Sequence, residues 1–146
     1  VGAETGHTGV VTEYLNRYRL QKWVVFTRGV TMEELPAVYQ GAEIFLYTSI
    51  YEGFGMPILE AITSGVPVIV SNTSAMPEAG GPGACLVTPR AVDQIACAIQ
   101  GISQDARLRH QMIKRGKVHA SKFASGVVTS QMMDLYVSEI ENSLDA

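Results

Sequence analysis

The chain has 146 residues, of which 47% are hydrophobic and 17% charged, and this balance excludes a largely disordered protein. Its formal net charge is −3 and it has no run of lysines or arginines, which argues against a broad nucleic-acid or membrane-surface interface. No apolar run approaches the roughly 18 residues of a membrane span and no signal-peptide pattern is found, so we expect one cytoplasmic domain, residues 1–146, with no transmembrane segment.

The first third of the chain predicts a helix followed by a strand. The opening Val1-Gly2 resembles the end of a strand, so we expect further chain before it, and His7 is interpreted as part of a turn. Four apolar residues then have the spacing of one helical face: Val11, Tyr14, Leu15 and Tyr18. The run Trp-Val-Val-Phe at residues 23–26 has the length and apolar character of a buried strand.

Strands and helices are expected to alternate through the middle of the chain. Thr31 and Glu34 have the spacing of a capping box at the start of a helix. Further strands are predicted at residues 44–47, 66–70 and 85–87, with helices at about 57–64 and 92–102 between and after them. Such alternation favours βαβ crossovers, and the predicted fold class is α/β with a Rossmann-like three-layer parallel sheet.

From Asp105 onward the pattern is helical only, which predicts extra C-terminal helices. An apolar stripe on the last of them is interpreted as a contact with the core: Met133, Tyr136, Val137 and Ile140.

The segment after the 44–47 strand is the richest in chemical signals. Its glycines, Gly53 and Gly55, let the backbone approach a ligand closely, and Pro57 suits the first turn of a helix. Because the first amides of a helix lack intrahelical partners, this turn is a candidate phosphate site.

Two glutamates flank that turn. Glu60 lies among apolar residues in the first two turns of the helix, and its side chain leans back toward the loop that carries Glu52. Two carboxylates on either side of amide donors suit a ligand with hydroxyls at both ends and phosphate between, such as a nucleotide sugar. The alternative is that Glu60 only stabilises the helix start and that Glu52 is a solvated loop residue.

The run Glu52-Gly-Phe-Gly-Met-Pro-Ile-Leu-Glu60-Ala resembles the Glu-x7-Glu signature of family-four retaining glycosyltransferases, the glycosyl transferases group 1. Residues 25–30, 34–39, 65–69 and 77–78 resemble the segments that flank this signature in the family. The resemblance covers roughly residues 20 to 140 and implies a partial C-terminal domain of a GT-B fold, which binds the nucleotide-sugar donor.

The resemblance also implies roles for individual residues. Glu52 is expected to be catalytic and to bind sugar hydroxyls, and Glu60 to bind the ribose. Backbone groups are expected to complete the donor site, with the amides of Gly53, Phe54, Gly55 and Met56 at the sugar, those of Ile58 and Leu59 at the diphosphate, and Gly29 and Val30 near the base. The implied donor is a UDP- or GDP-sugar, the acceptor a glycan or lipid, and neither a metal nor another cofactor is expected.

The implied enzyme is larger than this chain. An N-terminal acceptor domain, and an Arg and a Lys that stabilise the leaving diphosphate, are expected outside it, so the isolated chain should be inactive. Its surface facing the missing domain is expected to be apolar and to favour self-association. Peripheral membrane association of the intact enzyme is left open.

Two other readings remain. A GT-B-like epimerase or phosphorylase shares the architecture but is not expected to carry the Glu-x7-Glu run. The second alternative is a non-catalytic nucleotide-binding α/β module. A dehydrogenase is not favoured, because no Gly-x-Gly-x-x-Gly run opens a helix after a strand.

Overall fold

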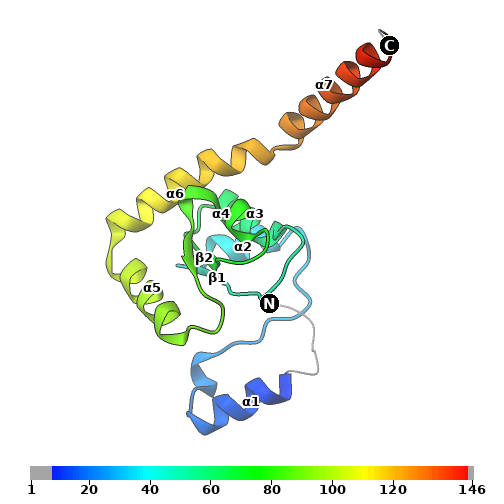
Figure 1. The fold of residues 1–146 in the computed structure, drawn as a ribbon. Coiled ribbons are helices and arrows are strands. Elements are labelled where there is room, and N and C mark those ends of the chain that lie inside the picture. The colour runs from blue at the N-terminus through cyan, green and yellow to red at the C-terminus, as the bar shows by residue number, and fades with distance from the viewer. Residues whose placement is uncertain (1–7, 145–146) are drawn as a thin grey trace. The chain divides into compact units, whose positions relative to one another are not determined.

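The computed structural model describes residues 8–144 (Figure 1). These residues divide into two units at the boundary between Leu35 and Pro36. His7 and the Val1-Gly2 opening therefore lie outside the described residues. The first unit contains helix α1 (Thr8–Arg17) and the short 3₁₀ helix η1 (Gln21–Trp23). The first predicted helix is confirmed.

The predicted strand at residues 23–26 is wrong. Trp23 ends η1, and although the backbone of Val24 is extended, with φ −122° and ψ 125°, residues 24–26 belong to no strand. A β-strand is stabilised by a hydrogen-bonded neighbour and by burial of its side chains. This segment pairs with no strand in the described part of the chain, and Val25 is 84% exposed.

The capping box is confirmed. The Glu34 carboxylate accepts from the Thr31 amide at 3.0 Å, and the Thr31 hydroxyl accepts from the Glu34 amide at 3.3 Å. These reciprocal bonds satisfy amides that would otherwise lack partners just before helix α2 (Leu35–Gln40).

The second unit is built on a parallel three-stranded sheet in the order β1-β2-β3. Its strands overlap the three remaining predicted runs, with β2 ending one residue beyond its run: β1 (Phe45–Tyr47), β2 (Val68–Ser71) and β3 (Cys85–Val87). The helices after β1 and β2 are α3 (Met56–Thr63), α4 (Met76–Gly80) and the 3₁₀ helix η2 (Gly81–Gly83). After β3 come α5 (Val92–Gln104), α6 (Ala106–Ala120), the 3₁₀ helix η3 (Ser121–Phe123) and α7 (Ser125–Leu144).

Helices cover both faces of the sheet. On one face, Ile69 and Val87 pack with Ile102 of α5 and Met112 of α6. Side chains alternate along a strand, so Val70 points to the opposite face, where it lies against Gly80 of α4. This arrangement confirms the three-layer α/β class.

Helix α6 lies unusually close to η2. A Cβ on Gly83 would come within 2.4 Å of the backbone N and Cα of Gly116, and a Cβ on Gly116 would lie 3.0 Å from Cγ2 of Ile62. The absence of side chains at both glycines lets α6 pack directly on η2 and on α3.

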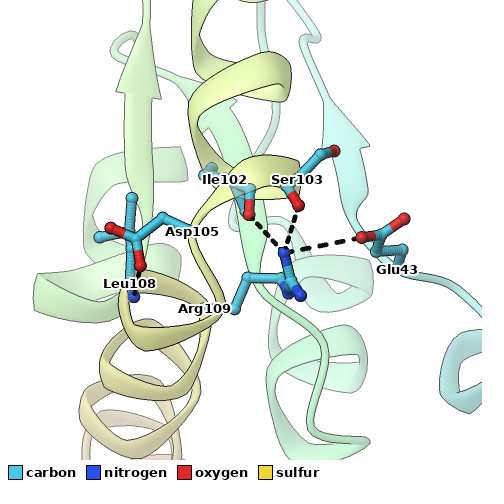
Figure 2. Close-up of polar contacts among 6 residues, drawn as sticks. All are labelled: Glu43, Ile102, Ser103, Asp105, Leu108 and Arg109. Carbon is cyan, nitrogen blue, oxygen red and sulfur yellow. Dashed lines mark hydrogen bonds and ion pairs between the residues drawn. The ribbon is translucent and has the colours of Figure 1, made fainter.

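Polar contacts fix the corner between α5 and α6 (Figure 2). The Asp105 carboxylate caps α6 by accepting from the Leu108 amide at 2.9 Å. The Arg109 guanidinium donates to the carbonyls of Ile102 at 2.8 Å and Ser103 at 2.5 Å, near the end of α5. It also approaches Glu43, just before β1, at 3.7 Å.

The extra C-terminal helices are confirmed, but the core contact predicted for the last one is wrong. The side chains of its apolar stripe are each about half exposed: Met133, Tyr136, Val137 and Ile140. No other helix or strand among the described residues covers this stripe, because α7 makes its main contacts with η3. Within residues 8–144 we find no helix long and apolar enough to cross a membrane.

Candidate functional site

The loop between β1 and α3 has a backbone conformation that depends on glycine. Gly55 is buried and adopts a left-handed conformation with φ +96°. A Cβ at this position would lie 2.9 Å from Cδ1 of Ile58. Pro57 follows in the first turn of α3, as predicted. The chain thus turns sharply from the carboxyl end of β1 into the start of α3.

The residues that follow β2 hold this loop from the side. The Thr73 hydroxyl donates to the Ile50 carbonyl at 3.1 Å. The Ser74 hydroxyl donates to the Glu52 carbonyl and accepts from the Glu52 amide at 3.3 Å. The carboxyl ends of neighbouring parallel strands meet at one edge of the sheet, which is where ligands bind in open α/β folds.

Each glutamate of the Glu-x7-Glu pair is hydrogen-bonded to a tyrosine. The Tyr47 hydroxyl donates to Oε1 of Glu52 at 2.8 Å, and the Tyr39 hydroxyl donates to Oε2 of Glu60 at 2.9 Å. Both carboxylates are half-buried. A carboxylate has about four lone-pair sites, so one phenol bond leaves acceptor capacity for a ligand hydroxyl.

Both phenols stay protonated near neutral pH. Burial, and then the hydrogen bond to Glu52, raises the pKa of Tyr47 to about 12. Burial, and then the hydrogen bond to Glu60, raises the pKa of Tyr39 still further above its ordinary value. The two hydroxyls therefore act as hydrogen-bond donors over the physiological pH range.

Sequence reasoning missed these tyrosines as site residues. Tyr39 lies in the helix predicted after the capping box and Tyr47 in the strand predicted at residues 44–47, and neither is among the predicted site residues. Buried tyrosines usually find a hydrogen-bond partner, and the sequence offered the signal that Tyr47 lies five residues from Glu52 at the end of a strand.

The loop between β1 and α3, called the motif loop below, also packs against η3, which directly follows α6. The ring of Phe54 lies 5.3 Å from that of Phe123 in η3, and Phe123 lies 5.2 Å from the His119 ring. Nε2 of His119 donates to the Glu78 carbonyl at 2.7 Å. Part of the helical tail thus supports the loop, although the stripe of α7 does not.

The backbone groups predicted to bind the donor are distributed over both units. Gly53 is exposed and Met56 lies at the start of α3, whereas the Ile58 amide donates to the Gly55 carbonyl at 2.9 Å. Gly29, with φ +70°, and Val30 belong to the first unit. The roles predicted for these backbone groups remain predictions.

The chain is similar to known proteins in both sequence and fold. Residues 10–119 match the family model described as glycosyl transferases group 1. O-antigen chain mannosyltransferase B from Escherichia coli is 36% identical over 127 residues, which cover 87% of this chain and 33% of that protein. This chain therefore spans about a third of the length of that curated relative.

Two solved structures have a similar fold. Sucrose-phosphate synthase from Thermosynechococcus elongatus matches with a TM-score of 0.84 and 26% identity, covering 97% of this chain and 36% of that one. The C-terminal domain of a glycosyl transferase group 1 family protein, LpcC, from Francisella tularensis matches with a TM-score of 0.68 and 26% identity. That match covers 82% of this chain and 65% of the Francisella chain.

Proposed function

This chain belongs to the glycosyl transferases group 1 family, and we propose on that premise that it is the donor-binding part of a retaining glycosyltransferase. Its GT-B fold class, inferred first from sequence resemblance, is confirmed. The observation that carries the proposal is the pair of tyrosine-held carboxylates, Glu52 and Glu60, on either side of a glycine-rich helix start. A nucleotide sugar offers the matching groups, because its hydroxyls lie on both sides of a diphosphate.

In the proposed complex, Glu60 accepts hydrogen bonds from the ribose hydroxyls. Glu52 is the catalytic residue that contacts the sugar, where its carboxylate accepts from sugar hydroxyls and fixes the ring relative to the leaving group. The diphosphate lies at the start of α3, where the helix dipole favours an anion. Exposed Gly53 gives the sugar a close approach to the backbone.

The sugar and the acceptor are proposed from the relative alone. The E. coli protein is named a mannosyltransferase acting on an O-antigen chain, which favours mannose as the transferred sugar and a growing polysaccharide as the acceptor. We propose that the acceptor domain, and the cations that stabilise the leaving diphosphate, belong to other parts of the full-length protein. The isolated chain is then a donor-binding part without transferase activity.

The roles of the two glutamates can be tested separately by calorimetric titration of the full-length protein with GDP, UDP and their mannose or glucose conjugates. Glu60→Gln keeps an acceptor for the Tyr39 hydroxyl but removes the charge, so it should weaken binding of nucleotides and nucleotide sugars alike, by roughly 1–2 kcal/mol. Glu52→Gln should weaken binding of the nucleotide sugar by a similar amount and leave the free nucleotide unaffected.

Glu139→Gln, at an exposed position on α7, is the matched control and should bind every ligand as the wild type does. Wild-type affinity in both site variants would contradict the proposed donor site. Binding of a nucleotide sugar without transfer of its sugar by the full-length protein would instead favour the non-catalytic nucleotide-binding module.

A further inference from the structure

The two tyrosines that hold the carboxylates belong to one row of aromatic rings, formed by Tyr39, Phe45 and Tyr47. Tyr39 packs edge-on against Phe45, with ring centroids 5.4 Å apart and planes at 76°. Phe45 stacks on Tyr47 at 5.8 Å with planes at 15°. Phe45 and Tyr47 are two positions apart on β1, so their side chains project to the same face of the sheet.

This aromatic row fixes the directions of two hydroxyls from a rigid base. Tyr39 is only 9% exposed, and ring packing of this kind restricts both side-chain torsions of a tyrosine. The Tyr39 hydroxyl reaches across from α2 to Glu60 on α3, and the Tyr47 hydroxyl reaches from the end of β1 to Glu52 in the following loop.

Glu52 is held at both its main chain and its side chain. Its amide and carbonyl bond to the Ser74 hydroxyl, while its carboxylate bonds to Tyr47. A loop glutamate held only by its backbone would sample several rotamers, and ordering it on ligand binding would cost conformational entropy. A pre-formed phenol bond lowers that cost before the ligand arrives.

We propose that Tyr47 is a positioning residue that orients the Glu52 carboxylate toward the donor sugar. Tyr39 orients Glu60 toward the ribose in the same way, and Phe45 keeps the two phenols in a common geometry. This inference rests on the proposed function. Neither tyrosine contacts the reacting atoms; each acts through the carboxylate that it holds.

The test uses the full-length protein with Tyr47→Phe and Tyr39→Phe, which keep the ring packing and remove only the hydroxyls. Titration calorimetry should show that Tyr47→Phe weakens binding of the nucleotide sugar about 3- to 10-fold and leaves the free nucleoside diphosphate unchanged. Tyr39→Phe should weaken binding of both ligands by similar factors. Tyr136→Phe, on the exposed face of α7, is the matched control and should change neither.

A double-mutant cycle separates positioning from a general structural effect. If Tyr47 acts only through Glu52, adding Tyr47→Phe to Glu52→Ala should cause no further loss of nucleotide-sugar affinity, and the same should hold for Tyr39→Phe in Glu60→Ala. Independent, additive losses in these cycles would overturn the inference, as would wild-type affinity in both single tyrosine variants.

These outcomes differ from a failure of the proposed function. If the wild-type full-length protein bound neither nucleoside diphosphates nor nucleotide sugars, the proposed function and this inference would both be overturned. If the wild type bound them and the tyrosine variants bound equally well, only the inference would be overturned.

Discussion

Replacing Gly83 with alanine adds a single methyl group but should destabilise the protein substantially. The added Cβ would stand 2.4 Å from the N and Cα atoms of Gly116 and 2.8 Å from the Met112 carbonyl oxygen. All three are backbone atoms of α6, so a simple rotamer change cannot relieve the clash. The helix as a whole must move away from η2.

The expected cost follows from overpacking at a rigid contact. Inserting a methyl group where the backbone must shift costs typically 1–3 kcal/mol. For a chain of this length, each kcal/mol lowers Tm by roughly 2–4 °C, so a decrease of about 2–12 °C is expected. Because the end of α6 leads into η3, which supports Phe54, the motif loop should loosen as well.

The matched control is Gly101→Ala. Gly101 is exposed within α5, and a Cβ built there meets no atom within 4 Å. Alanine at a helix interior is favoured over glycine by roughly 0.5–1 kcal/mol, so this variant should be slightly more stable than the wild type. Thermal unfolding followed by circular dichroism gives the Tm of both variants and of the wild type. Equal Tm shifts of the same sign would refute the argument from the close packing of α6 on η2.

Three further predictions concern the corner, the phenols and the tail. Arg109→Ala removes charge-assisted hydrogen bonds to two carbonyls near the end of α5 and should lower the free energy of unfolding in denaturant by about 1.5–3 kcal/mol. Glu43→Gln removes only an ion pair at 3.7 Å to an exposed carboxylate and should lower it by less than about 1 kcal/mol. Equal losses in the two variants would contradict this ranking. The raised pKa of Tyr47 stabilises the fold fully below pH 10, its ordinary pKa, and this contribution is lost between about pH 10 and 12, because the unfolded chain releases the phenol proton first. The stability advantage of the wild type over Tyr47→Phe should therefore shrink across that window, and a constant difference in unfolding free energy would contradict the assignment. The exposed apolar stripe of α7 should make the isolated chain self-associate in light scattering, and a strictly monomeric species at high concentration would contradict this expectation.

Local signals in the sequence were sufficient for most elements of the second unit. Pro57 near the helix start and the apolar runs of the predicted strands are short-range signals. They located α3 and the three strands to within about two residues. The capping box at Thr31 and Glu34 is equally local, and its two reciprocal bonds are present.

The errors concern features that depend on distant partners. Trp23 to Phe26 has strand-like composition, but a strand needs a neighbour to pair with, and composition does not reveal whether one is present. The apolar spacing on α7 correctly indicated a helical face, yet periodicity alone does not say whether anything covers that face.

The candidate site was predictable only where its signals are local in the sequence. The spacing from Glu52 to Glu60 and the glycine-rich turn between them are contained in nine residues, so they could be recognised in the sequence. The link from Tyr39 to Glu60 spans 21 positions and joins a side chain of α2 to a side chain of α3, two helices that local sequence signals do not relate to each other. The Ser74 contact with Glu52 spans 22 positions and depends on β1 and β2 being neighbours.

The most direct test of the donor-binding claim is calorimetric titration of the wild-type full-length protein with GDP, UDP and ADP, followed by the mannose or glucose conjugate of whichever nucleotide binds. We expect selective saturable binding of one nucleoside diphosphate and of its sugar conjugate. At a ligand concentration 100 times Kd, that binding should raise the free energy of unfolding by about 2.7 kcal/mol. Absence of binding for every nucleotide and nucleotide sugar would contradict the central claim that this chain forms the donor site of a glycosyltransferase.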